Sequence, residues 1–337
     1  MKAFITGSTG FLGSHVARAL LSGGAELRLL VRSSSRLDNI ADINADRVVG
    51  DLREVESLTL GMSGCDVVFH VAADYRLWSL NSSELYDSNV EGTRNILNAA
   101  KATGVRRVVY TSSVATMGFG NNGRLTDENT PATLSNMIGD YKRSKFMAEQ
   151  LVIAAARAGQ DVVMVNPTTP IGERDIKPTP TGQIIVDFLK RKFPAYVDTG
   201  LNLLDVLDCA EGHLLALEKA KAGERYILGH RNMTLGEFLG ALSRISDRKP
   251  PRVRLPYIPV LFAAYVDEAV ATWVRRAQPR IPLTGVKMAK TYMYFNCSKA
   301  VRSLGMPQTS VEGAMGNAIE WYFRSGYVKD SRSAGRS

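Results

Sequence analysis

The chain has 337 residues, of which 45% are apolar and 22% are charged. These proportions are typical of globular proteins, and they exclude a largely disordered chain, a collagen-like repeat and a coiled coil. The 42 Lys and Arg residues outnumber the 33 Asp and Glu residues, which gives a net charge of +9. That surplus is compatible with nucleic-acid binding, with a site for phosphorylated anions, or with a solvated basic surface.

The three cysteines and four histidines lie far apart in the chain. Because they form neither a disulfide framework nor a C-x-x-C pair, they indicate a reducing compartment and no metal site. The first residues lack the pattern of a signal peptide, and the most apolar late stretch, 260–266, is shorter than the roughly 20 residues that span a bilayer. We therefore expect a cytoplasmic protein that is at most peripheral to a membrane.

Short apolar segments alternate with amphipathic segments through the first half of the chain. The apolar segments are rich in β-branched residues and end at Gly, Asp or Ser, which is typical of strands buried on both faces of a parallel sheet. The predicted strands are 2–6, 26–31, 47–50, 66–71, 106–112 and 161–166, and the predicted helices are 11–22, 84–103 and 141–158. This alternation predicts an α/β fold with a Rossmann-type, doubly wound parallel sheet.

The second half of the chain has a different pattern. Four prolines crowd residues 167–180, and further elements follow as a helix at 183–192, a strand at 203–206, a helix at 208–220 and a strand at 225–228. From Thr234 the chain is mostly helical, with breaks at 249–251 and 279–282. We predict a dinucleotide-binding domain over 1–166, joined again by about 203–228; a smaller, mostly helical substrate lobe over 167–202 and 229–328; and a flexible tail over 329–337.

The strongest local motif follows the first predicted strand. Gly7, Gly10 and Gly13 have the spacing G-x-x-G-x-x-G, a variant of the dinucleotide fingerprint. These glycines allow a tight turn, a close approach of a pyrophosphate and close packing of the helix on the strand. The alternative is an ordinary glycine-rich turn, but the position between a strand and a helix favours the nucleotide site. The predicted cofactor residues of this loop are Gly7, Thr9, Gly10, Phe11, Leu12 and Gly13.

The end of the second strand distinguishes the two nicotinamide cofactors, because a carboxylate there binds the ribose 2′-hydroxyl and an arginine accommodates a 2′-phosphate. No acid occurs between Leu29 and Asp38, whereas Arg32 and Arg36 are present. We therefore predict NADP as the cofactor, with NAD the less favoured alternative. The fold also suggests adenine contacts from Asp51 and Leu52, and room for the cofactor at Ala72 and Ala73.

A tyrosine and a lysine at the start of a predicted helix suggest proton-transfer chemistry. Tyr141 and Lys145 share one helical face, and a nearby ammonium lowers the pKa of a phenol. Tyr141 would then move the hydroxyl proton while hydride transfers to or from nicotinamide. Ser113, at the end of the fifth strand, would donate to a substrate oxygen. Alternatively, the pair lies on a surface helix and the serine only caps a turn.

Together these motifs resemble the extended short-chain dehydrogenase/reductase superfamily, including its NAD-dependent epimerase/dehydratase family, over roughly residues 1–325. The resemblance implies that Ser113, Tyr141 and Lys145 are catalytic, that Tyr141 and Lys145 also contact the cofactor with Asn166, Pro167 and Thr168, and that Asn89 is a structural or site asparagine. The further motifs that carry it are Asp51-Leu52, His70-Val71-Ala72-Ala73, Asn89-Val90-x-Gly92-Thr93, Tyr110-Thr111-Ser112-Ser113 and Asn166-Pro167.

Segments 166–172, 175–182 and 194–202 are similar to the dihydroflavonol 4-reductase-like branch, and within it to the hopanoid-associated sugar epimerase group. The resemblance implies a sugar-like or polyol-bearing substrate, including a hopanoid lipid. Because Arg32 replaces the usual acid, we favour a reductase over an epimerase that retains its cofactor. A non-catalytic dinucleotide sensor is a minor alternative, and no aromatic and basic platform for nucleic acid is evident.

Three features of the second half stay open at this stage. Arg174, Lys177, Lys190 and Arg191 either hold a substrate diphosphate or are solvated surface residues. Residues 255–274 are interpreted as a lobe helix packed on the core, with a lipid-contacting patch as the alternative. By family analogy, the helices at 84–103 and 141–158 would form the seam of a homodimer.

Overall fold

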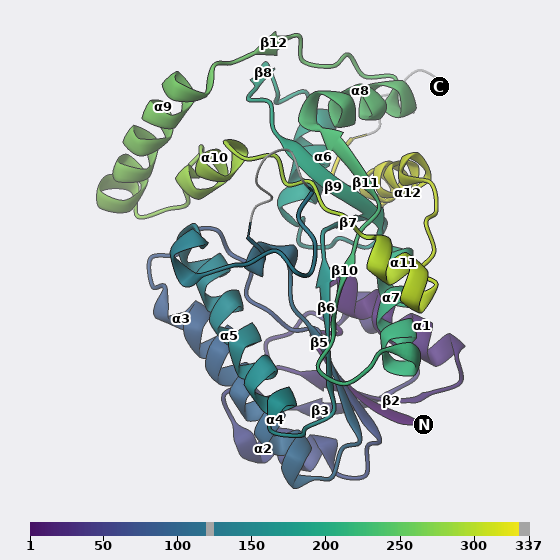
Figure 1. Ribbon diagram of the computed structural model, residues 1–337. Coiled ribbons are helices and arrows are strands. Elements are labelled where there is room, and N and C mark those ends of the chain that lie inside the picture. Colours follow the sequence, from purple (N-terminus) through teal and green to yellow (C-terminus); the bar gives the residue numbers. More distant parts are fainter. Residues whose placement is uncertain (119–124, 330–337) are drawn as a thin grey trace.

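A seven-stranded parallel sheet forms the centre of the computed structural model, which describes residues 1–118 and 125–329 (Figure 1). The order in which the strands are added reverses beside β1, because β2 and β3 lie on one side of that strand and β4 lies on the other. Ligands of such sheets bind at the carboxyl ends of the strands near this reversal. In spatial order the strands are β10 (Arg225–Leu228), β6 (Val162–Pro167), β5 (Arg107–Thr111), β4 (Val67–His70), β1 (Lys2–Thr6), β2 (Glu26–Val31) and β3 (Asp46–Val49). The predicted Rossmann-type fold is confirmed.

Helices cover both faces of this sheet, so its strands are buried on both sides (Figure 1). One face packs against α1 (Phe11–Ser22), α7 (Val206–Lys219) and α11 (Ser298–Leu304). The other face packs against α2 (Val55–Met62), α4 (Gly92–Ala102) and α5 (Gly139–Arg157). This burial explains why the strands are almost continuously apolar.

The predicted boundaries of several helices and strands agree with those of the structure. β1, β2, β10 and α1 have the predicted limits, whereas α2 was not predicted. The predicted helix at 84–103 is continuous but irregular: α3 (Ser83–Tyr86) leads through a π-helical turn at Asp87–Glu91 into α4. Such a bulge often marks a functional site.

The smaller lobe combines helices with a second sheet, in the order β11-β9-β7. The segment 203–206, which we expected to return to the Rossmann domain, contributes most of its length to β9 in this lobe sheet. α7 and β10 return to the first domain as expected, and so does α11, which lies within the range predicted for the lobe. The sheet strands are β7 (Thr169–Ile171), β9 (Gly200–Asp205) and β11 (Arg231–Thr234), and the helices packed on them are α6 (Pro180–Leu189), α8 (Leu235–Ser246) and α12 (Val311–Arg324). The sequence pattern could not separate the two sheets, because a strand's partners are distant in the chain.

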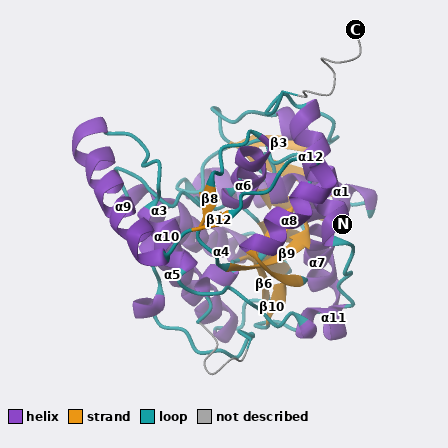
Figure 2. Ribbon diagram, turned by 90° about the horizontal axis from the view of Figure 1, so that it is seen from above, coloured by secondary structure: helices purple, strands orange, loops and turns teal. Residues whose placement is uncertain are grey.

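A helical arm extends from this lobe. It follows the short pair β8 (Ala195–Tyr196) and β12 (Val253–Arg254), and it contains α9 (Tyr257–Val270), a π-helical turn at Ala271–Arg275 and α10 (Leu283–Ala289). In both views α9 lies at the edge of the molecule (Figures 1 and 2).

The interpretation of 255–274 as a helix packed on the core is wrong. Ala264 and Ala271 are fully buried, but Trp273 is 83% exposed and Ile258 is 76% exposed. The helix from Tyr257 to Arg275 is also longer than the apolar stretch suggested, and by length and composition alone it passes as a membrane span, with 11% of it buried. The predicted tail lies, from residue 330 onward, outside the described residues.

Candidate active site

The glycine turn joins β1 to α1 with little space between them. Gly7 has φ +75°, a left-handed conformation that favours glycine, and a Cβ on it would lie 2.6 Å from the Ala72 nitrogen. A Cβ on Gly13 would lie 2.1 Å from the Gly7 carbonyl oxygen. The first and third glycines are therefore required by backbone packing.

The start of α1 leaves donors available for an anion. Gly10 is its N-cap and supplies no side-chain hydrogen bond, and the first turn has no acidic residue. The first N–H groups of a helix have no partner within it, and they carry a partial positive charge. The Ser8 hydroxyl is also buried without a hydrogen-bond partner. The turn therefore fits the pyrophosphate of a dinucleotide.

The other predicted loop residues lie around this turn. Phe11 is buried edge-on against the His15 ring, with centroids 5.7 Å apart, while Thr9 and Leu12 are half-buried. Ala72 and Ala73, just past the end of β4, are also half-buried. The Ala72 backbone lies directly against Gly7.

The end of β2 is basic and exposed. The Arg32 backbone N–H donates to the Ser35 hydroxyl at 3.1 Å, and its side chain projects to solvent. Arg36 instead forms an ion pair with Asp38 at 2.6 Å, so it is less available for a phosphate. Asp51 accepts two hydrogen bonds from the Arg53 guanidinium, and this contact lowers the pKa of Asp51. Leu52, beside Asp51, is half-buried.

The structure brings together two predicted catalytic hydroxyls. Ser113 follows β5 and Tyr141 lies in the first turn of α5, and the two side chains are close enough for Ser113 to oppose the effect of burial on the pKa of Tyr141. The Ser113 oxygen accepts from the Ala115 N–H at 3.1 Å, which fixes the serine at the turn. Two residues 28 positions apart therefore lie together at the carboxyl edge of the sheet.

Lys145 lies one helical turn after Tyr141, in a buried position. Its ammonium donates to the Tyr110 hydroxyl at 3.1 Å and to the Thr111 carbonyl at 2.9 Å. Burial lowers the pKa of Lys145 to about 8. We expected the lysine to lower the pKa of Tyr141, but burial raises the pKa of Tyr141, and the neighbouring Ser113 side chain opposes that rise. The reason is that the ammonium is directed to Tyr110 and Thr111.

A buried carboxylate on α5 links the residues that flank this site by hydrogen bonds. Glu149 is 1% exposed; it accepts from the Ser112 hydroxyl and, at 2.8 Å, from the Asn166 amide. It also pairs with Arg225 at 3.2 Å. The Asn166 amide donates in turn to the Ser113 carbonyl at 3.1 Å. Sequence reasoning missed Glu149, although its spacing of four residues after Lys145 places it on the same helical face.

A second buried network lies beside β4. His70 bonds to the Thr6 hydroxyl at 2.8 Å and to the Thr93 hydroxyl at 3.2 Å, and burial lowers the pKa of His70 to about 3. Asn89, in the π-helical turn, donates to Ser144 at 3.0 Å and to the Asp74 carbonyl at 2.9 Å. The predicted asparagine therefore links the loop after β4 to α5.

The end of β6 and the residue after it carry polar atoms without hydrogen-bond partners. The Asn166 side-chain oxygen and the Thr168 hydroxyl are buried without hydrogen-bond partners, and Pro167 between them is buried. Thr168 is fixed by its backbone N–H, which donates to the Leu228 carbonyl at 2.9 Å. These atoms are available to a bound ligand.

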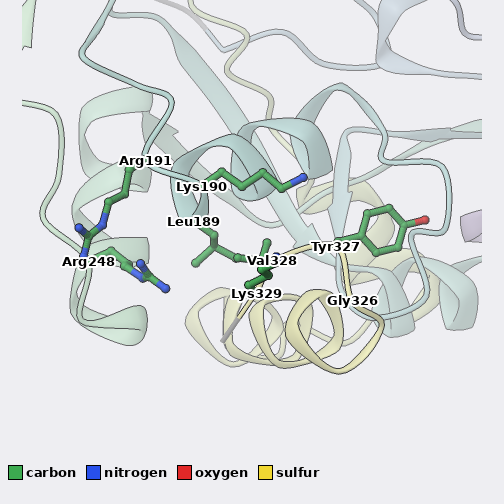
Figure 3. A pocket seen from close by; sticks show the side chains of 8 residues that line it. All are labelled: Leu189, Lys190, Arg191, Arg248, Gly326, Tyr327, Val328 and Lys329. Atoms are coloured by element: carbon green, nitrogen blue, oxygen red, sulfur yellow. The ribbon is translucent and has the colours of Figure 1, made fainter. Parts of the chain in front are cut away.

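The four basic residues considered for a diphosphate do not gather in one place. Arg174 pairs with Asp42 at 3.3 Å, and Lys177 is exposed. Lys190 and Arg191 line a different cavity of about 560 Å³ beside the last helix (Figure 3). None of that cavity's lining residues is a predicted catalytic or cofactor residue, so the cavity is separate from the site described above.

Comparison with known proteins places these observations in a family. The model of the NAD-dependent epimerase/dehydratase family matches residues 3–229. A Synechocystis protein named "Putative dihydroflavonol 4-reductase" is 49% identical over 97% of this chain and 96% of its own length. Sterol demethylase protein B of Methylococcus capsulatus is 31% identical over 97% of this chain and 100% of its own.

Further similarity extends to a ketoreductase and to solved structures. A Stigmatella aurantiaca ketoreductase, named for a 3-oxo-4-farnesyl-dihydroquinoline-1-oxide, is 32% identical over 90% of this chain and 91% of its own. The crystal structure of gox2253 has 45% identity and a TM-score of 0.87, covering 97% of this chain and 99% of its own. A nucleoside-diphosphate-sugar epimerase from Pseudomonas aeruginosa has 25% identity and a TM-score of 0.80, covering 98% and 99%.

Proposed function

Because the chain belongs to the NAD-dependent epimerase/dehydratase family of extended short-chain dehydrogenases/reductases, we propose that it is an NADP(H)-dependent reductase. It interconverts a carbonyl and a secondary alcohol on a sugar-like or polyol-bearing substrate, including one attached to a lipid. The observation that carries this proposal is the placement of Tyr141 beside Ser113 at the carboxyl edge of the sheet, with Lys145 one turn further along α5.

Bound NADPH supplies the hydride for this reaction. The glycine turn and the start of α1 would hold its pyrophosphate, and Arg32 would pair with its 2′-phosphate. The unpartnered Ser8 hydroxyl and the absence of a side-chain cap at Gly10 support this fit.

Tyr141 is the proton donor to the carbonyl oxygen. Since burial raises the pKa of Tyr141, the phenol is protonated at neutral pH, as reduction requires. Ser113 donates a second hydrogen bond to the same oxygen and stabilises the charge that develops there. Lys145, whose ammonium is held by Tyr110 and Thr111 one turn further along α5, would contact the bound cofactor.

The names of the relatives support a lipophilic substrate. One relative is named for sterol demethylation and another for a farnesylated ketone, and both are at least 31% identical to this chain. We therefore place the reacting carbonyl or polyol on an apolar skeleton, as in a hopanoid side chain.

The second candidate is an epimerase that oxidises and then reduces its substrate with a retained cofactor. The similarity to a nucleoside-diphosphate-sugar epimerase favours it. The lack of a carboxylate at the end of β2, where Arg32 projects to solvent, favours the reductase. Both reactions use the same three side chains.

The deciding experiment follows nicotinamide absorbance while candidate ketones are offered with NADPH. Stoichiometric oxidation of NADPH supports the reductase, whereas product without net change in cofactor supports the epimerase. Tyr141→Phe should abolish turnover and leave NADPH binding within about twofold, since the phenol ring is kept. Turnover by Tyr141→Phe at the parent rate would contradict the assigned proton donor.

A further inference from the structure

The outward side of α9 and the turn that follows it is apolar along its whole length. Residues separated by three, four or seven positions share one side of a helix. Six residues with this spacing are exposed by between 40% and 83%, and we call them the apolar face: Ile258, Phe262, Tyr265, Val266, Val270 and Trp273.

The charged groups of this helix point the other way. Asp267 accepts from the Arg275 guanidinium at 2.6 Å and from the Ile281 N–H at 2.7 Å, and Glu268 accepts from the Leu283 N–H at 3.3 Å. A helix on the surface of a water-soluble protein normally shows the opposite arrangement, with its apolar side buried. Exposure of a contiguous apolar surface indicates a partner.

The charge around the arm identifies the kind of partner. Residues 248–290 contain nine Lys and Arg but only two acids, so this segment carries seven of the nine surplus charges of the chain. Both carboxylates accept hydrogen bonds from other residues of the arm. Arg252 precedes the apolar face, Arg276 and Arg280 follow it, and all three are exposed. Basic side chains at both ends of an apolar face complement anionic lipid headgroups.

We propose that the apolar face docks this enzyme on an anionic lipid bilayer, with α9 parallel to the membrane surface. Tyr265 and Trp273 lie at the headgroup level, where amphipathic aromatic rings are favoured. The helix does not cross the bilayer, because Asp267 and Glu268 would then lie within hydrocarbon.

The arm also borders the candidate active site. A Cβ on Gly139, the first residue of α5, would lie 2.9 Å from the Thr284 side chain in α10. Tyr141 is two residues further along α5, and α10 packs against α9. Resting on the proposed function, the inference is that a lipid-borne substrate enters from the bilayer between the arm and α5.

Vesicle flotation without cofactor or substrate tests the docking. The full chain is mixed with vesicles of phosphatidylcholine alone or of phosphatidylcholine with phosphatidylglycerol, whose anionic headgroups attract basic segments. We expect flotation with the anionic vesicles and weaker flotation with neutral vesicles or at high salt. Phe262→Ser with Trp273→Ser should weaken binding about 100-fold, since two large apolar side chains leave the lipid.

A matched control changes two exposed apolar residues far from the arm, Val49→Ser with Leu60→Ser, and should float like the parent. These residues are 65% and 73% exposed, comparable to Phe262 and Trp273. A blue shift of fluorescence on adding anionic vesicles, present in the parent and absent in Trp273→Phe, reports insertion without depending on the double variant.

Failure of the parent to float and to shift its fluorescence would overturn the proposal. A concentration-dependent dimer that the double variant loses, seen by light scattering without vesicle binding, would also overturn it and assign the face to a second copy. Tyr141→Phe should float like the parent, because docking needs no turnover. If the enzyme floats with the vesicles but none of the ketones offered leads to oxidation of NADPH, the proposed reaction is refuted and the docking proposal stands.

Discussion

Two glycine-to-alanine substitutions in the glycine turn distinguish its contribution to stability from its contribution to cofactor binding. In Gly13→Ala the new Cβ would lie 2.1 Å from the Gly7 carbonyl oxygen and 2.6 Å from its carbon, and both atoms are backbone. Since unbonded heavy atoms normally stay about 3.5 Å apart, α1 must retreat from β1 by roughly 1 Å. Such overpacking costs about 1–3 kcal/mol, of which the better helix propensity of alanine offsets up to about 1 kcal/mol.

Gly10→Ala is the matched control. Its Cβ would lie 3.2 Å from the Gly7 oxygen, so only a slight adjustment is needed. Loss of the glycine N-cap costs up to about 1 kcal/mol. The methyl group nevertheless projects where a pyrophosphate approaches α1.

Urea unfolding and NADPH titration by fluorescence measure the two effects. Gly13→Ala should lose about 1–2 kcal/mol of stability and weaken NADPH binding about tenfold or more, because the helix N-terminus is displaced. Gly10→Ala should weaken NADPH binding at least as much, with a smaller loss of stability. If the free energy of unfolding and the NADPH affinity of Gly13→Ala both equal those of the parent, the close packing of strand and helix does not position the cofactor.

Three further predictions concern charged groups. Arg32→Asp should weaken NADPH binding about tenfold and strengthen NADH binding, because an ion pair to the 2′-phosphate is lost; equal affinities of the parent for both cofactors in titrations would refute this assignment. Burial raises the pKa of Asp175 to about 6 from 3.8, so the folded state favours the protonated acid, and the free energy of unfolding should fall as pH rises from 4 to 7. Asp175→Asn should remove up to about 3 kcal/mol of that fall in urea titrations at each pH, whereas an unchanged pH dependence would contradict the assignment. Glu149→Ala should lower the free energy of unfolding by about 3 kcal/mol, because Arg225 and the Asn166 amide lose a buried partner; a loss below about 0.5 kcal/mol would show that water replaces the carboxylate.

Local sequence determines much of this protein. Strand–helix alternation indicated the parallel sheet, because strands buried on both faces must be apolar. The spacing of Gly7, Gly10 and Gly13 predicted a tight turn, and the left-handed φ of Gly7 with the close packing of Gly13 gives the physical reason for two of these glycines. These features depend on residues within a few positions of one another, so periodicity and spacing reveal them.

Only the tertiary structure decided which distant groups meet. It directed the Lys145 ammonium to Tyr110, so the lysine does not offset the burial that raises the pKa of Tyr141. It placed β9 in the lobe sheet and exposed the apolar side of α9. Helical periodicity shows that a helix has an apolar side, but whether that side is covered depends on elements packed against it from elsewhere in the chain. The direction in which a side chain points, its burial and the charges beside it are properties of the assembled fold, because each depends on atoms brought together only when distant segments pack.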